Sequence, residues 1–167
     1  MIVRPAAKNE RAWIVATLRR RWGSTVIVTQ SRECDASVLD ALVAIDETAA
    51  REDPRVGLLT YRFDERGLEV VTIDALRLRA GIGGALLDRV TEIVRGAGAE
   101  RIWLITTNDN LGAISFYESR GFCVVAVHKG AVDRARALKE SIPLVASNGI
   151  EIHDEIELAL EVADPAP

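Results

Sequence analysis

The chain has 167 residues, of which 49% are hydrophobic and 28% are charged. This length and composition are typical of one globular domain with an apolar core, and they leave no room for a second domain of ordinary size. The formal net charge of −4 argues against nucleic acid as the main partner, because nucleic-acid binding favours a basic surface.

The cysteines and the first residues bear on where the protein works. Cys34 and Cys123 are far apart and outside any Cys-x-x-Cys spacing, so we expect two small buried thiols, without a disulfide framework or a zinc site. Residues 1–5 lack the basic-then-apolar pattern of a signal peptide. No stretch approaches the ~18 apolar residues that span a bilayer. We therefore expect a cytoplasmic protein with no membrane partner and no bound metal.

The first half of the chain is expected to form short strands around one helix. Strand-like runs occupy residues 2–4, 26–28, 42–45, 56–62 and 68–73. Asn9 is the predicted N-cap of a helix that ends near Arg21. Residues 35–39 are expected to form a turn or a short helix, and residues 48–55 a loop. Because Asp64 to Gly67 has turn chemistry, the last two strands are predicted to pair as a hairpin.

In the second half the apolar period changes from 2 to about 3.6 residues. A helix that begins near Ile82 is predicted to stop at residues 96–98, and another helix spans residues 111–120. Apolar strands are predicted at residues 101–106 and 122–127, so strands and helices alternate and indicate a sheet covered by helices. Further on, residues 131–140 are predicted to be helical. Residues 155–162 alternate charged and apolar side chains, which is typical of an antiparallel strand with one solvated face.

The segment from residue 73 to residue 87 carries the most informative chemistry. A loop leaves a strand, passes two arginines and enters a helix through the three glycines of Gly81-Ile82-Gly83-Gly84. Glycines let a backbone approach a ligand closely, and the N–H groups of a helix N-terminus attract anions, so a pyrophosphate fits this turn. A Walker loop is excluded because no Gly-Lys-Ser/Thr occurs, and the dinucleotide fingerprint fails because its third glycine is Leu86.

A second motif follows at residues 110–122, with the pattern N-x-x-A-x-x-F-Y-x-x-x-G-F. The glycine turn resembles motif A of the GNAT acetyl-CoA-dependent N-acetyltransferases, and this second motif resembles their motif B. The order, the spacing and the intervening strand match, and the resemblance extends over the whole chain. It implies one α/β (α+β) domain at residues 1–163, and the Asp-Pro-Ala-Pro tail at residues 164–167 is expected to be frayed. The expected fold is a mixed central sheet, splayed between two parallel strands and flanked by helices.

The resemblance also implies where acetyl-CoA binds. The cofactor would lie in the gap between the two parallel strands, with its pantetheine arm paired to the strand that ends at Ile73. The glycine turn would bind the pyrophosphate, and Asn110 and Ala113 would line the arm. The implied cofactor-binding residues are Ile73, Ala75, Arg79, Ala80, Gly81, Ile82, Gly83, Gly84, Ala85, Asn110, Ala113 and Phe116.

One position departs from the family pattern. The Gln or Arg that the family places three residues before the first glycine is Leu78 here. Arg77 and Arg79 flank this leucine, so a neighbouring arginine is expected to supply charge for the phosphates. The sequence leaves open which of the two does so.

The implied reaction makes specific demands on the site. An alkylamine has a pKa of ~10.4, so at neutral pH it must lose a proton before it can attack. The resemblance implies that Tyr117 points its hydroxyl towards the thioester sulfur, and a tyrosine of pKa ~10 can donate a proton to the leaving thiolate. Glu69 is the candidate base, because in an extended strand it would share a face with Val71 and Ile73. The alternative is that Glu69 is a solvated strand residue.

Several alternatives stay open at this point. The chain could be a catalytically silent acyl-CoA-binding sensor or partner module, and its acyl donor could be longer than acetyl. The amine acceptor could be a small molecule, a peptide N-terminus or a lysine, and the sequence does not decide whether the protein is a homodimer. Residues 22–40 and 129–149 are expected to form the acceptor side. Because a simple hairpin would need only two residues, we expect the long connection at residues 129–154 to be ordered and to wall the acceptor pocket. His128 and His153, at its two ends, are expected to be surface histidines.

Overall fold

The structure is a computed structural model of the chain, and it describes residues 1–48, 53–77 and 80–162. Leu78, Arg79, residues 49–52 of the predicted loop and the predicted tail at 164–167 lie outside the described residues. The elements in chain order are β1 (Ile2–Pro5), η1 (Lys8–Glu10), α1 (Arg11–Trp22), β2 (Val26–Thr29), β3 (Arg32–Asp35), η2 (Ala36–Val38), β4 (Asp40–Ile45), β5 (Arg55–Asp64), β6 (Gly67–Ala75), α2 (Ile82–Gly96), β7 (Arg101–Thr107), α3 (Leu111–Glu118), β8 (Cys123–His128), α4 (Ala131–Leu138) and β9 (Glu155–Glu161).

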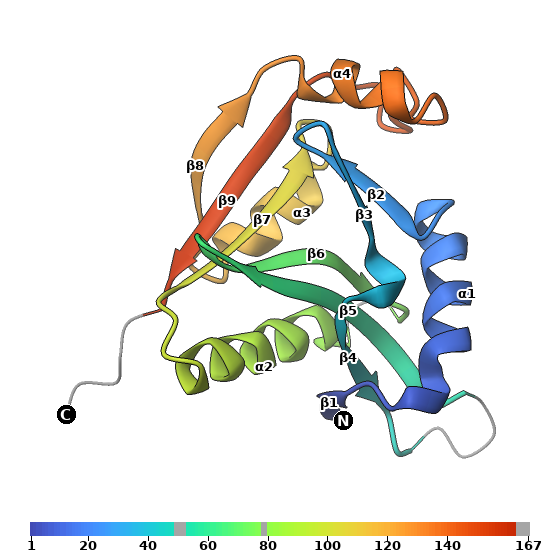
Figure 1. Ribbon diagram of the computed structural model, residues 1–167, viewed down its shortest axis with the longest axis vertical. Coiled ribbons are helices and arrows are strands. Elements are labelled where there is room, and N and C mark those ends of the chain that lie inside the picture. The colour runs from blue at the N-terminus through green and yellow to red at the C-terminus, as the bar shows by residue number, and fades with distance from the viewer. Residues whose placement is uncertain (49–52, 78–79, 163–167) are drawn as a thin grey trace.

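The described strands form one large sheet and one small hairpin (Figure 1). The large sheet has the order β1-β4-β5-β6-β7-β9-β8. Among these described strands only β6 and β7 are parallel, and every other neighbouring pair is antiparallel. Strands β2 and β3 pair with each other as a separate hairpin. This arrangement confirms the predicted mixed sheet, with its hairpin of β5 and β6 and its antiparallel last strand.

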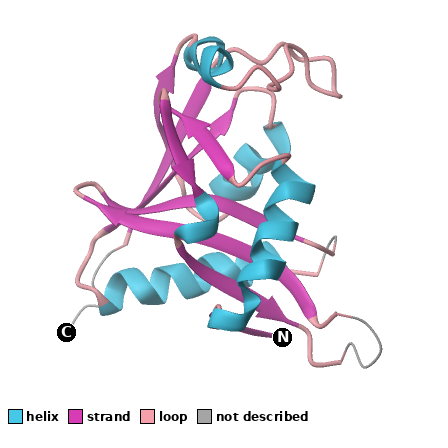
Figure 2. Cartoon of the chain, turned by 45° about the vertical axis from the view of Figure 1, so that its right-hand side comes forward, coloured by secondary structure: helices cyan, strands magenta, loops and turns pink. Residues whose placement is uncertain are grey.

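Helices cover both faces of the large sheet (Figure 2). On one face, α2 and α3 pack on the larger apolar cluster, to which the sheet contributes side chains such as Val70 and Leu104. On the other face, α1 packs through Ile14 and Leu18 on a smaller cluster that includes Ile27 of the hairpin. Helix α1 and the β2–β3 hairpin therefore lie on one face of the large sheet, and α2 and α3 lie on the other face.

The sequence pattern of α2 explains its position. Ile82, Leu86, Val90 and Val94 recur every four residues and are almost fully buried against the sheet. Burial of each such side chain stabilises the fold by roughly 1.5–3 kcal/mol. The helix starts directly after Gly81, which has a φ of 69° in the left-handed region. A residue with a Cβ would be strained there, so this glycine fixes where the helix begins.

The start of α1 differs from the prediction. Asn9 lies in the short turn η1 and is not the N-cap, because the α-helix begins at Arg11. Instead, the buried Glu10 supplies the side-chain contacts at this turn. Its carboxylate accepts a hydrogen bond from the Ala7 N–H at 2.7 Å and forms an ion pair with Arg4 at 2.7 Å. Both interactions lower the pKa of Glu10. The first turn is therefore held by a glutamate that reaches back towards β1.

The hairpin of β2 and β3 was missed, and the expectation of two buried thiols is wrong. Gln30 and Ser31 form the hairpin turn with positive φ values of 48° and 58°, although neither is one of the glycine or asparagine residues that usually signal such a turn. Cys34 is half-buried and Cys123 is exposed on the edge strand β8, and both are free thiols. Within the described residues, no helix is long and apolar enough to cross a membrane.

Candidate active site

The parallel pair β6–β7 separates part-way along its length. Residues 68–70 pair with residues 102–104, and no rung follows in the described parts of the two strands. A cavity of about 260 Å³ lies where the strands part, and residues 70–74 of β6 and 104–106 of β7 line it. The predicted splay is therefore present. The facing strand edges offer backbone N–H and C=O groups that an extended ligand can pair with.

A β-bulge accounts for the place where the strands part. The register of β5 against β6 shifts between Thr60 and Tyr61, which leaves Val71 as an extra residue of β6. A bulge bends its strand and increases the local twist, and this one directly follows Val70, the last residue that pairs with β7. The bulge also changes the faces of the strand: Val71 packs on the cluster around α1, whereas Ile73 packs on the cluster around α2.

The end of α1 lies against this gap. Asp74 is buried near the end of β6, and its carboxylate accepts hydrogen bonds from Arg21 Nε at 3.0 Å and from Trp22 Nε1 at 2.7 Å. All three residues line the cavity. Two charge-assisted bonds to one buried carboxylate hold the last turn of α1 in a fixed place beside the separated strands.

Tyr117 enters the same cavity from α3. Its ring is 6% exposed and packs against Phe116 and Phe122, with ring centroids 5.4 and 5.7 Å away. Its hydroxyl has no hydrogen-bond partner among the described residues, although Tyr117 lines the gap. Burial, with a smaller effect of the Asp74 charge, raises the pKa of Tyr117 above its usual value. The hydroxyl is therefore a protonated donor with a free hydrogen at the gap.

The glycine turn forms the N-terminus of α2. The first intrahelical bond runs from Ala85 N–H to Gly81 C=O, which leaves the N–H groups of residues 82–84 without an intrahelical acceptor. A Cβ on Gly83 would stand 3.0 Å from the Phe116 ring. The turn therefore presents N–H donors at the positive end of a helix dipole, and α3 packs closely against it through Phe116.

The remaining predicted residues divide into two groups. Asn110 and Ala113 line the gap, and the Asn110 side chain also caps α3 by accepting a hydrogen bond from the Ala113 N–H at 3.4 Å. Ala75 and Phe116 do not line the gap in the described structure and pack against the larger apolar cluster instead. Of the flanking arginines, Arg77 forms an ion pair with Asp46 at 2.7 Å.

A second cavity of about 270 Å³ adjoins the gap. The two cavities share four lining residues, which are Trp22, Ile105, Thr106 and Asn110. The second cavity extends between β2, the start of β9 and the segment from α4 to Pro143. Its walls are mostly apolar, with Glu155 and Lys139 as the charged lining residues. Residues 132–143, in the long connection between β8 and β9, thus contribute one side of this cavity.

Comparison with known proteins agrees with this geometry. Residues 28–122 match the sequence profile of the acetyltransferase (GNAT) family. The chain belongs to this family. An uncharacterized protein of Bacillus subtilis, YdhI, is 38% identical over 156 residues, which cover 93% of this chain and 95% of that protein. The matched profile spans both the glycine turn and the motif of α3.

Two solved GNAT-like structures share the fold at low sequence identity. A Bacillus subtilis acetyltransferase in complex with CoA has a TM-score of 0.64 and 18% identity, over 96% of this chain and 98% of that one. A GNAT family acetyltransferase from Elizabethkingia anophelis with acetyl-CoA bound has a TM-score of 0.62 and 18% identity, over 96% and 97%. The described residues of this GNAT chain include no group of three or more His, Cys, Asp or Glu side chains that could hold a metal ion.

The expected face of Glu69 is corrected by the bulge. Glu69 lies in the paired part of β6, opposite Trp103, before the strands separate. Because the bulge at Val71 intervenes, Glu69 and Ile73 lie on opposite faces of the strand, and Glu69 lines neither cavity of this GNAT domain. Its carboxylate accepts an ion pair from Arg62 at 2.6 Å. Burial raises the pKa of Glu69, while the Arg62 charge opposes that rise.

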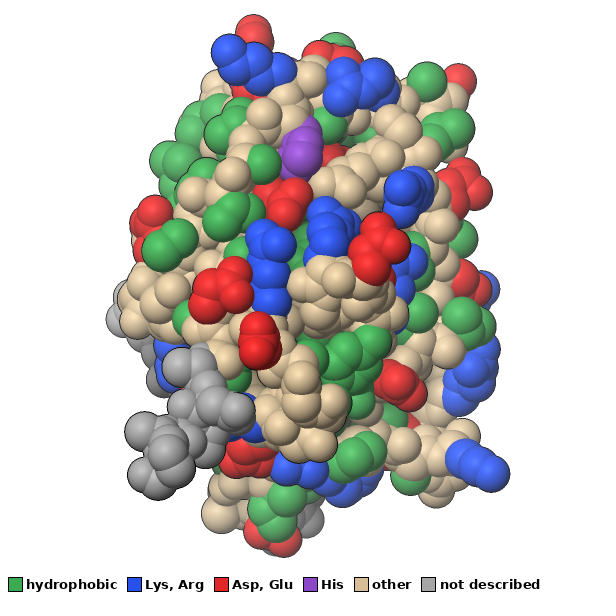
Figure 3. Space-filling view, turned by 60° about the vertical axis from the view of Figure 1, so that its left-hand side comes forward, with side chains coloured by type: hydrophobic (Ala, Val, Ile, Leu, Met, Phe, Trp, Pro, Cys, Tyr) green, Lys and Arg blue, Asp and Glu red, His purple; other side chains and the backbone are tan. Residues whose placement is uncertain are grey.

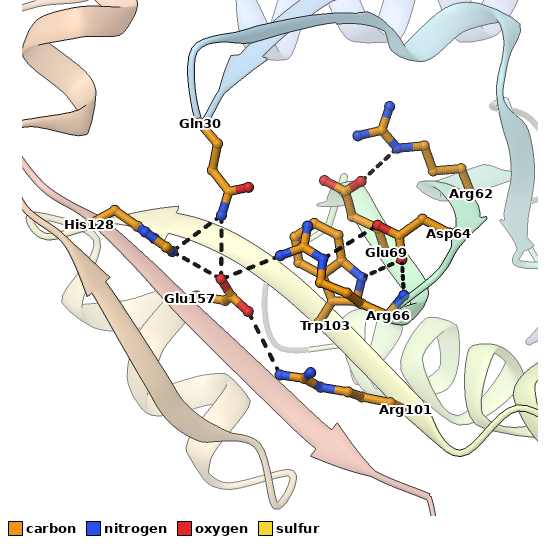
Figure 4. A network of polar contacts seen from close by, with 9 residues as sticks. All are labelled: Gln30, Arg62, Asp64, Arg66, Glu69, Arg101, Trp103, His128 and Glu157. Carbon is orange, nitrogen blue, oxygen red and sulfur yellow. Dashed lines mark hydrogen bonds and ion pairs between the residues drawn. The ribbon is translucent and has the colours of Figure 1, made fainter.

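The ion pair of Glu69 and Arg62 lies beside a separate polar network that is centred on the buried Glu157 (Figure 4). Four polar or cationic side chains approach the Glu157 carboxylate: His128 at 2.9 Å, Gln30 at 3.3 Å, Arg66 at 3.6 Å and Arg101 at 3.7 Å. Figure 3 shows one side of the molecule, where acidic and basic side chains are interspersed around a histidine. The network fixes the tip of the β2–β3 hairpin, through Gln30, to strand β9.

Two residues of this GNAT site, Arg21 and Trp22, could not be assigned from the sequence. The sequence assigns no site role to Arg21 and includes Trp22 only in the expected acceptor side, yet both bind Asp74 and line the gap. No local pattern marks them, because the contact joins residues 52 and 53 positions apart. The available signal was Asp74 itself, a carboxylate near the end of a mostly apolar strand that leads to the glycine turn.

Proposed function

We propose that this GNAT chain is an N-acetyltransferase that moves the acetyl group of acetyl-CoA to a primary amine while both are bound. The observation that carries the proposal is the junction of the two cavities, where the gap that holds the Tyr117 side chain meets the second cavity at Trp22, Ile105, Thr106 and Asn110. A donor in one cavity and an acceptor in the other can react at this junction, and such positioning converts a bimolecular reaction into one within a complex.

The gap fits the arm and phosphates of acetyl-CoA. The separated edges of β6 and β7 offer N–H and C=O groups to the amides of an extended arm, and we assign Ile73, Asn110 and Ala113 to its lining. The free N–H groups of residues 82–84 suit a pyrophosphate at the start of α2. The fold is shared with proteins that hold CoA or acetyl-CoA, which supports the same co-substrate here. Arg79 is proposed, from the sequence, to add positive charge to the phosphate site.

The residues of the gap suit acyl transfer to an amine. The Tyr117 hydroxyl is protonated and has a free hydrogen, so it is the proposed proton donor to the departing thiolate. Backbone N–H groups on the separated strand edges can stabilise the negative charge that develops on the thioester oxygen. Bound acetyl-CoA supplies the activated acetyl group. The acceptor must lose a proton, and Glu69 gains no support for this task because it lies outside both cavities.

The test is a thiol-release assay with product analysis. Purified protein is incubated with acetyl-CoA and a broad panel of primary amines, free CoA is titrated, and the products are identified by mass spectrometry. We expect stoichiometric CoA and N-acetylated amine with at least one class of amine. Tight acetyl-CoA binding without turnover across the panel would instead indicate a catalytically silent acyl-CoA-binding module.

A further inference from the structure

One carboxylate of the second cavity has no role in the site described so far. Glu155 is the first residue of β9, is 2% exposed and lines the cavity that adjoins the gap. Both of its carboxylate oxygens accept from the same donor, the backbone N–H of Gln30 at 3.1 and 2.9 Å. Within the described chain this is its one hydrogen-bond donor, and no cationic side chain lies within ion-pair distance of it. A buried carboxylate with so few partners is costly unless a ligand completes its surroundings.

The next residue on the same face of β9 provides a contrast. Glu157 is also buried, but His128, Arg66 and Arg101 all approach its carboxylate within 4 Å. Glu157 therefore has its counter-charges within the protein, and it does not line the cavity. Two glutamates on one strand face thus differ in one respect: the carboxylate that faces the cavity is the one without a cation.

The cationic groups near Glu155 do not neutralise the charge of its carboxylate. His128 of β8 and Arg134 of α4 act on it only from a distance, and burial outweighs them and raises the pKa of the Glu155 carboxyl. Lys139 lines the same cavity, but its Nζ donates to the Val26 carbonyl at 3.2 Å and not to Glu155. An entering ammonium group would supply the missing counter-charge.

The rest of the cavity indicates what carries that ammonium. Its walls are mostly apolar side chains, among them Ile27, Val132 and Ile142. Because Lys139 also faces this space, a second positive charge on the ligand would be repelled. A cavity of about 270 Å³ with one unpaired carboxylate therefore suits a small molecule with one cationic nitrogen and an apolar body.

We propose that Glu155 binds the acceptor's ammonium group and accepts its proton, and that the acceptor is a small alkyl- or arylalkylamine with a single positive charge. This inference rests on the proposed acetyl transfer. The ammonium gives one proton to Glu155, and the neutral nitrogen attacks the thioester carbon as the carbon–sulfur bond breaks. The thiolate takes the Tyr117 proton, the second nitrogen proton restores the Tyr117 hydroxyl through water, and Glu155 returns its proton to solvent.

The experiment compares wild-type protein with Glu155→Gln, using hexylamine and phenethylamine as probes and hexamethylenediamine as a doubly charged comparator. The glutamine oxygen can still accept the Gln30 N–H, so the variant is expected to fold, and its thermal stability should equal or exceed that of the wild type. Glu161→Gln is the matched control, because Glu161 lies on the same strand and its side chain is 74% exposed.

We expect the wild type to favour the singly charged amines over the diamine by at least about tenfold in kcat/KM. Glu155→Gln should lower kcat/KM for hexylamine by about 100-fold at pH 7. Between pH 7 and 9 its kcat/KM should then rise about tenfold per pH unit, because the variant depends on free amine of pKa ~10.4, whereas the wild type stays nearly flat. Glu161→Gln should behave as wild type, and all three proteins should bind acetyl-CoA equally.

Unchanged kcat/KM and an unchanged pH profile in Glu155→Gln would overturn the inference and leave the proposed acetyl transfer intact. A preference for the diamine would overturn the singly charged acceptor. If no amine turns over, the proposed function fails, and calorimetry on CoA-saturated protein then decides about Glu155. Hexylamine binding that is lost in Glu155→Gln supports the amine site, and absence of binding to the wild type overturns it.

Discussion

Removing the Tyr117 hydroxyl tests its role in catalysis without removing the packing contacts of the ring. The ring is 6% exposed and packs on Phe116 and Phe122, but the hydroxyl forms no hydrogen bond within the described chain. Tyr117→Phe therefore removes no protein hydrogen bond and keeps the ring contacts. We expect its free energy of unfolding to stay within about 0.5 kcal/mol of wild type. Tyr117→Ala, which empties the same space, should cost about 3–5 kcal/mol.

The effect on the rate should be much larger. General acid catalysis is typically worth ~100-fold or more, which corresponds to about 2.7 kcal/mol of transition-state stabilisation. Because the pKa of Tyr117 is raised, its hydroxyl stays protonated at every pH where the protein is assayed and is available as a donor. Tyr117→Phe should therefore lower the single-turnover rate of thiol release about 100-fold.

Three measurements on the same preparation separate the chemical step, acetyl-CoA binding and stability. Single-turnover thiol release reports the chemical step, calorimetry with acetyl-CoA reports binding, and thermal unfolding reports stability. We expect a reduced rate with acetyl-CoA affinity and stability nearly intact. A wild-type rate under chemistry-limited conditions would show that the hydroxyl is not the acid, and a loss of acetyl-CoA affinity would show that Tyr117 acts mainly in binding.

The other predictions concern the phosphate site, the acceptor wall and pH. Gly83→Val places a Cβ 3.0 Å from the Phe116 ring and narrows the turn. Calorimetry should therefore show acetyl-CoA binding that is at least tenfold weaker, which corresponds to about 1.4 kcal/mol. Gly96→Ala is the control, because a Cβ there meets open space, and its acetyl-CoA affinity should equal that of the wild type. Unchanged affinity in folded Gly83→Val would displace the pyrophosphate from this turn. Ile142→Trp reduces the volume of the second cavity, so it should raise the KM for the amine about tenfold and leave the acetyl-CoA affinity unchanged. An unchanged KM would show that residues 131–143 do not contribute to the acceptor site. The raised pKa of Tyr117 means that the protonated acid persists above its ordinary pKa of ~10, so kcat should show no alkaline decline up to that pH, and a decline near pH 8 would contradict the assignment.

Local sequence patterns were sufficient for the helices that carry the site. Glycine spacing and apolar periodicity predict where α2 begins and that a helix follows residue 110, whereas the place of residues 110–122 in the site is implied by the family resemblance. The structure brings Ile73, Asn110, Ala113 and Tyr117 to one cavity, as the family resemblance implied. The sequence of neither β6 nor β7 specifies where their pairing stops. The splay between them was therefore expected from the family resemblance alone.

The features that were missed depend on contacts between distant segments. One extra residue at Val71 reverses the faces of β6, and a period-two pattern has no means of showing this, so Glu69 was placed beside Ile73. The β2–β3 hairpin turns at Gln30 without a glycine, and the Gln30 N–H donates a hydrogen bond to the carboxylate of Glu155, 125 residues later, which supports that turn. Glu155 itself seemed an ordinary charge on a solvated strand face, because the burial that sets it apart comes from the hairpin and the segment after α4.

The most direct test of the proposed acetyl transfer is a crystal structure of the chain with CoA and an N-acetylated amine bound together. We expect the pantetheine arm to lie between β6 and β7, with the CoA sulfur within hydrogen-bonding distance of the Tyr117 hydroxyl. We also expect the acetamide to lie at the junction of the two cavities, whose shared lining residues are Trp22, Ile105, Thr106 and Asn110. CoA bound outside the gap, or an acetylated amine bound away from that junction, would contradict this proposal.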